Sequence, residues 1–146
     1  MVDADTDGQE MAMPDSPSSL AETGIVSKST SKAVAEALTV LAELIKARGM
    51  TVFTIIDHSG EAKRRGLELR DTKLVIFGSP VGGTPVMEAV PLAALDLPLK
   101  VLVWDDGGQT TISYVDPGVL AERHHLNAEL ASRLAGIGPL TDALID

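Results

Sequence analysis

The residues of this chain best suited to chemistry are two histidines and one glycine-rich segment. His58 and His124 carry imidazoles, which donate, accept or take up a proton near neutral pH. The segment "GSPVGGTP", residues 78–85, precedes an expected helix that is capped by Thr84 and begins near Pro85. The amides of Gly82 and Gly83 would then bind an anion or a carbonyl oxygen at the positive end of that helix.

The same segment resembles the first part of a nucleotide-binding P-loop, but two features argue against that function. Gly78 and Gly83 have the right spacing, yet Thr84 follows Gly83 directly and the lysine of the motif is missing. Pro80 also removes one amide that a phosphate would need. A flexible turn that only requires glycines and is capped by Thr84 is the simpler interpretation.

Each histidine also has a structural interpretation. His58 follows an expected strand and precedes a short helix expected to be capped by Ser59, where it can hydrogen-bond the turn. His124 lies four residues after Leu120 on the apolar side of a predicted helix, which is typical of a partly buried structural group. The chain has no cysteine, and its three histidines lack local ligand spacing, so no metal or cofactor is predicted.

Composition and charge restrict the partners. The net charge is −9, and residues 1–23 hold six acids and no base, which leaves 15 acids and 12 bases in the rest. Without a basic patch or a long apolar stretch, the sequence predicts no nucleic-acid binding, no membrane span and a soluble cytoplasmic protein. Residues 1–22 are rich in Asp, Ser, Pro and Gly and are expected to form a disordered, dispensable tail.

The rest of the chain, 23–146, is expected to form a single α+β domain. Apolar spacing predicts a long helix over 31–48, capped between Ser29 and Ser31 and closed by Gly49. Runs rich in β-branched residues predict strands at 50–57 and 73–78, and a hairpin around Asp106-Gly107 in which Trp104 and Tyr114 pair. Asp116-Pro117 and Asn127 open two further helices, the second of which runs to the break at Gly138-Pro139. Few connections are long enough for parallel crossovers, which favours an antiparallel sheet with helices on one face.

Four stretches resemble domain-of-unknown-function family 302 over about residues 24–137: "IDHSGEA", "LVIFGSPVGGTPVM", "LDLPLKVLVWDDGGQTTISY" and "DPGVLAERHHL". The resemblance implies a β-α-β4-α topology similar to half of the TATA-binding-protein fold, and a dimer. It implies no reaction, since the family has none assigned. Members of the family more often carry Asn, Lys and Ala where this chain has Ser79, Val81 and Gly82, and losing the lysine weakens an anion site.

We therefore expect a non-catalytic small-ligand-binding or regulatory homodimer that associates through its sheet. The candidate ligand-binding residues are His58, Gly78, Ser79, Gly82, Gly83, Thr84 and His124. The alternatives are an enzyme that uses His58 or His124 as acid/base with amides of 78–84 as the oxyanion site, and a structural dimerisation module without a site. One further hypothesis places the 78–84 segment within reach of His58, which requires the two preceding strands to run parallel.

Overall fold

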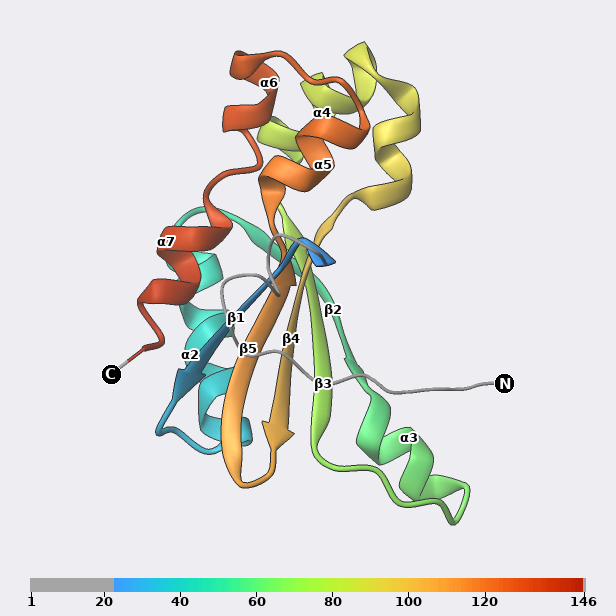
Figure 1. Ribbon diagram of the computed structural model, residues 1–146, viewed down its shortest axis with the longest axis vertical. Coiled ribbons are helices and arrows are strands. Elements are labelled where there is room, and N and C mark those ends of the chain that lie inside the picture. The colour runs from blue at the N-terminus through green and yellow to red at the C-terminus, as the bar shows by residue number, and fades with distance from the viewer. Residues whose placement is uncertain (1–22, 146) are drawn as a thin grey trace.

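The fold is a five-stranded antiparallel sheet with helices, as the computed structural model of residues 23–145 shows (Figure 1). The predicted tail, residues 1–22, lies outside the described residues. The strands are β1 (Ile25–Thr30), β2 (Thr51–Asp57), β3 (Thr72–Gly78), β4 (Leu99–Asp106) and β5 (Gln109–Val115). Their order is β1-β5-β4-β3-β2, and every neighbouring pair is antiparallel. The predicted α+β class is confirmed.

The helices lie on one face and at both ends of this sheet. They are α2 (Val34–Ala47), α3 (His58–Arg64), α4 (Pro80–Ala89), the 3-10 helix η1 (Pro91–Asp96), α5 (Pro117–Arg123), α6 (Ala128–Ser132) and α7 (Ile137–Asp142). Figure 1 shows α2 behind the sheet, α3 beyond its lower end, and α4, α5 and α6 beyond its upper end. The sheet therefore has two separate ends at which a site can form.

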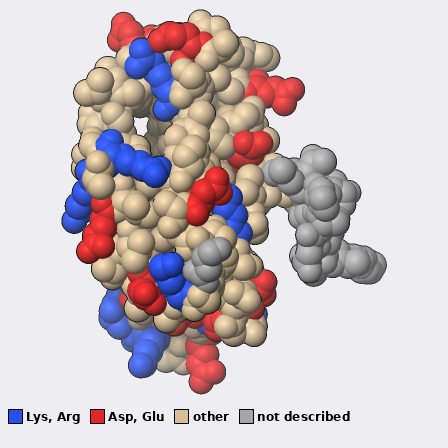
Figure 2. All heavy atoms as spheres, turned by 90° about the vertical axis from the view of Figure 1, so that its left-hand side faces the viewer, with Lys and Arg blue, Asp and Glu red and all other residues tan. Residues whose placement is uncertain are grey.

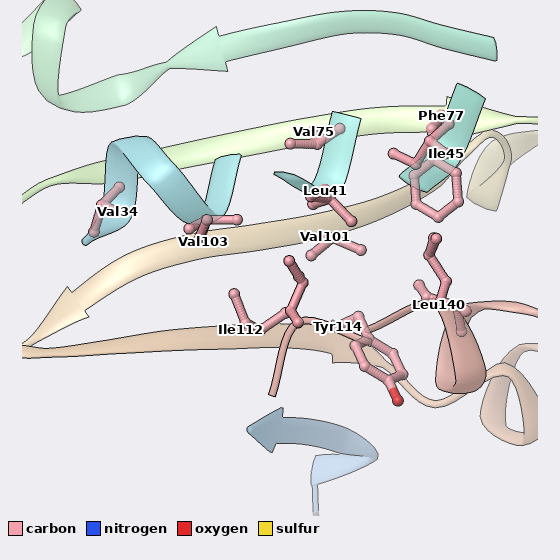
Figure 3. Close-up of a cluster of buried hydrophobic side chains, with 13 residues drawn as sticks. Val34, Leu41, Ile45, Val75, Phe77, Val101, Val103, Ile112, Tyr114 and Leu140 are labelled. Carbon is pink, nitrogen blue, oxygen red and sulfur yellow. The ribbon is translucent and has the colours of Figure 1, made fainter. Parts of the chain in front are cut away.

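The core lies between α2 and one face of the sheet (Figure 3). Leu41 and Ile45 of α2 are fully buried against strand residues such as Val75, Phe77 and Val101. Because successive strand residues point to opposite faces, the intervening side chains point away from α2. These half-buried residues define the open sheet face: Ile56, Leu74, Ile76, Leu102 and Trp104.

Several predicted caps lie elsewhere. Helix α2 begins after Ala33, which has extended backbone and no side-chain cap, rather than between the predicted Ser29 and Ser31. Asp57, rather than Ser59, caps α3 by accepting from Gly60 N at 2.8 Å. The hairpin turn consists of Gly107 and Gly108, both with positive φ, one residue beyond the predicted pair. Asp116 and Asn127 cap α5 and α6 as predicted.

Two predictions about the second half of the chain are wrong. The helix expected over 128–137 ends at Ser132, and Gly138-Pro139 lie inside α7, because proline is tolerated in the first turn of a new helix. Trp104 and Tyr114 do not pair. Tyr114 points into the core, whereas Trp104 is on the open sheet face, where its Nε1 donates to Ser113 Oγ at 2.9 Å.

Candidate functional site

The glycine-rich segment is the first turns of helix α4. Ser79 has extended backbone and caps the helix, which begins at Pro80 rather than near Pro85. Gly82 N donates to Ser79 Oγ at 3.1 Å, and Gly83 N donates to Ser79 O at 2.7 Å. Both amides that we predicted to bind an anion are therefore already bonded. The Ser79 hydroxyl lies three residues before the Gly82 amide, which is the usual geometry of an N-cap. Thr84 lies exposed in the middle of the helix, where it is too late in the chain to cap the start.

His58 lies far from this segment, so the hypothesis that they form one site is wrong. Strands β2 and β3 are antiparallel, with Thr51 opposite Gly78 and Asp57 opposite Lys73. Gly78 is therefore beside the start of β2, while His58 follows its end. Seven strand residues separate the two positions by about 20 Å. In Figure 1 helix α3, which begins at His58, and helix α4, which begins at Pro80, lie at opposite ends of the sheet.

The surroundings of His58 are those of a structural turn. The His58 side chain is exposed, whereas its neighbour Ser59 is buried and accepts from Thr72 N at 3.1 Å. Asp57 accepts from Lys73 Nζ at 2.6 Å, and this bond, followed by the one from Gly60 N, lowers the pKa of Asp57 to about 2. These contacts fasten α3 to the start of β3.

A wide groove of about 940 Å³ lies beside this turn, between α3 and the segment 66–71. Charged residues of both signs line it, among them Lys63, Glu68 and Arg70, and most of its walls are exposed. His58 is not part of its lining. Its only large apolar side chains, Leu67 and Leu69, are exposed, so it lacks the mostly apolar lining that holds most small ligands.

His124 is the candidate residue with the most defined surroundings. Its side chain is 10% exposed, and its Nε2 lies 2.7 Å from Asp96 Oδ2. The same oxygen accepts from Arg123 at 3.1 Å. The hydrogen bond from His124, with that from Arg123, lowers the pKa of Asp96. The pair fastens η1 to the end of α5 at the same end of the sheet as α4.

An open pocket of about 370 Å³ lies at this end, where β5 meets the last three helices. We call it the α5–α7 pocket. Figure 2 shows an opening in the upper half of the side that carries α6 and α7. Most of the lining is small and apolar, and its polar groups are a phenol, a carboxylate and a hydroxyl. The lining residues are Tyr114, Asp116, Pro117, Gly118, Ala121, Ala131, Ser132, Ala135 and Gly138.

Lys28 of β1 holds one wall of this pocket in place. Its Nζ donates to Gly138 O at 3.1 Å, to Thr141 Oγ1 at 2.7 Å and to Asp142 Oδ1 at 2.7 Å. The same ammonium lies 5.2 Å from the centroid of the Tyr114 ring. The bonds connect α7 to the sheet, and they use the three donors of the lysine.

The structure thus brings together His124 and α4 at one end of the sheet, and leaves His58 at the other. Sequence reasoning missed Asp96, which is 28 residues from its partner His124. It also missed the α5–α7 pocket. The sequence pointed to this pocket only through Ala131 and Ala135, which are four residues apart and so lie on one side of a helix. That spacing is equally typical of a helix in the core.

Residues 23–145 contain neither a metal-binding cluster nor a membrane-spanning helix. No group of three His, Asp or Glu side chains there is placed to hold a metal ion. No helix in that range is long and apolar enough to cross a membrane.

Comparison with known families agrees with the fold. Residues 26–138 match the family described as "Domain of unknown function DUF302". The chain belongs to this family. The crystal structure of an uncharacterized conserved DUF302 protein from Bacillus stearothermophilus has a TM-score of 0.73 and 21% identity, over 85% of this chain and 97% of that one. At this identity the likeness shows the DUF302 fold alone.

Curated relatives of this DUF302 chain are longer. It is 38% identical over 128 residues to the fluoride-specific ion channel FluC 1 of Brucella suis biovar 1, a match to 84% of this chain and 50% of that protein. The match to FluC 2 of Brucella melitensis biotype 1 is likewise 38%, over 84% of this chain and 47% of the relative. The chain therefore spans about half the length of the curated relatives it matches.

Proposed function

We propose that this DUF302 chain is a small-ligand-binding, regulatory module whose ligand enters the α5–α7 pocket. The pocket itself is the observation that supports the proposal most. Its 370 Å³ are within the range typical of small-molecule sites, and its lining combines an apolar wall with a few polar groups. This site replaces the predicted one at 78–84, whose amides are bonded to Ser79.

The Brucella relatives suggest the setting in which such a module acts. The matched half of those channel proteins corresponds to this chain, in which no described helix is long and apolar enough to span a membrane. We assign the conduction of fluoride to their other half and a regulatory role to the DUF302 half. The mostly apolar lining around the Asp116 carboxylate does not suit a buried fluoride ion. For this chain we keep the cytoplasm as the proposed compartment.

Filling the pocket tests the proposal. Ala131 lines the pocket, whereas Ala128 is exposed on the same helix and outside the lining, so Ala131→Phe and Ala128→Phe form a matched pair. Saturation-transfer NMR with a library of one- and two-ring fragments should find binders in the wild type and in Ala128→Phe, and lose them in Ala131→Phe. Binding that survives Ala131→Phe, or an absence of binders, would refute the pocket as the site.

We also propose that the module is a homodimer formed through the open sheet face. Helix α2 covers the opposite face of the sheet, and Leu74, Ile76 and Leu102 project away from it. Removing such a face from water stabilises association. Sedimentation equilibrium at micromolar concentration should give twice 15.3 kDa. Leu102→Glu should give the monomer mass, and a monomeric wild type would contradict the proposal.

An enzyme is the second candidate, and the observation in its favour is the Asp96–His124 pair. A carboxylate that accepts from one imidazole nitrogen leaves the other nitrogen available as a base. In that role, His124→Gln should abolish turnover of a substrate found by activity screening, while Arg123→Gln, which removes the other partner of Asp96, should not.

A further inference from the structure

We propose that the ligand of the α5–α7 pocket is a small apolar molecule with a protonated amine, held by the carboxylate of Asp116. The inference rests on the proposed function, because it assigns a chemical class to the occupant of the same pocket. Its basis is the charge and hydrogen bonding of the residues that line the cavity.

Asp116 is a carboxylate that keeps acceptor capacity. It caps α5, where its Oδ1 accepts one long bond, 3.3 Å, from Gly118 N, and its own amide is fixed by Gly24 O at 2.8 Å. An ionised carboxylate has about four acceptor sites. Every ion pair among residues 23–145 involves another acid, namely Asp57, Glu61, Asp96, Glu129 or Asp142. Within that range the negative charge of Asp116 is therefore not paired.

The lining supplies no cation that would balance this charge. It contains Asp116 and no Lys, Arg or His. Lys28 lies behind one wall, and its three donors are used by Gly138, Thr141 and Asp142. A ligand cation would pair with Asp116, whereas a ligand carboxylate would bring two negative charges together.

The remaining lining indicates the body of the ligand. Ala121, Ala131 and Ala135 form a wall without polar side-chain atoms, and Tyr114 adds an aromatic ring. Small side chains leave room for a flat or branched hydrocarbon, and the Tyr114 ring can pack against it. The combination suits an arylalkylamine or a compact aliphatic amine.

Three probes that share a phenylalkyl body separate the possibilities: 2-phenylethylamine, 2-phenylethanol and 3-phenylpropionate. Their dissociation constants are measured by ¹H–¹⁵N NMR titration of the full chain at pH 7 and low salt. The amine should bind about tenfold more tightly than the alcohol, since its positive charge pairs with the carboxylate, whereas the alcohol is a neutral donor. The carboxylate should bind most weakly.

Asp116→Asn tests the residue while preserving the helix cap, because asparagine caps as well as aspartate. In this variant the amine should bind no more tightly than the alcohol. The affinity for the alcohol should be the same as in the wild type. Asp105→Asn is the matched control: Asp105 accepts from Gly108 N at 2.7 Å in the hairpin turn, outside the pocket. That variant should bind all three probes like the wild type.

The outcomes separate this inference from the proposed function. If the alcohol or the carboxylate binds as tightly as the amine, or if no probe binds, the amine assignment is overturned. The pocket still stands in that case if the fragments found by saturation transfer are lost in Ala131→Phe. If no fragment binds the wild type, or if the fragments still bind Ala131→Phe, the proposed function fails as well.

Discussion

His125 occupies a backbone conformation that suits glycine, and its replacement by glycine should stabilise the protein. Its φ is +53°, directly after the last turn of α5, where Leu126 N donates to Ala121 O at 2.9 Å. This is the left-handed residue that commonly ends a helix. The His125 side chain is exposed, and within residues 23–145 its ring makes no hydrogen bond or ion pair. The substitution therefore tests the backbone alone.

The expected gain follows from two opposing effects. The left-handed conformation costs a residue with a Cβ roughly 1–2 kcal/mol. Glycine gains freedom in the unfolded chain, which offsets about 0.4–1 kcal/mol of this. His125→Gly should therefore raise the free energy of unfolding by about 0.5–1 kcal/mol, which is about 2–4 °C in Tm for a chain of this size. His125→Asn should give a similar gain, since asparagine adopts this conformation more readily than histidine.

Gly49 provides the reverse experiment. It ends α2 with a φ of +78°, and a Cβ placed there would meet no atom within 4 Å. Gly49→Ala should therefore lower the stability by a similar amount through the backbone alone. Thermal and urea unfolding of the three variants would measure both changes. A lower Tm for His125→Gly, or no change for Gly49→Ala, would refute the reasoning from backbone conformation.

Three further outcomes are expected. Leu41→Ala should lose about 2–5 kcal/mol in urea unfolding, because Leu41 is fully buried and its removal leaves a cavity; a loss below 1 kcal/mol would mean that α2 packs loosely. Asp57 has its pKa lowered from 3.8 to about 2, so its stabilising contribution is complete above pH 4 and is lost as the pH falls through 2. Asp57→Asn should flatten the pH dependence of Tm between pH 4 and 2, and an unchanged slope would contradict this. Lys28→Met should lose about 1–3 kcal/mol and speed hydrogen exchange of α7 amides, since three bonds to α7 disappear; unchanged exchange in α7 would show that Lys28 does not hold this helix.

Helices and their starts could be predicted where the residues that determine them lie close together in the sequence. The apolar spacing of Leu41 and Ile45 predicted α2, and Asp116 and Asn127 marked the starts of two helices because each caps an amide two or three residues away. The glycine segment was misassigned for the same kind of reason. Ser79 and Thr84 are both plausible caps, and only the backbone of Ser79, extended where β3 ends, decides between them.

The sequence by itself determined the class of the fold, the family and the absence of cysteine chemistry, since each depends on composition or on short contiguous motifs. Tertiary structure alone decided which candidate residues meet. The antiparallel pairing of β2 with β3 separates His58 from Gly78. The return of the chain after β5 brings His124 to Asp96 and forms the walls of the α5–α7 pocket. These contacts depend on strand pairing and helix packing between residues far apart in the chain, whose energies are set by the whole core rather than by neighbouring residues.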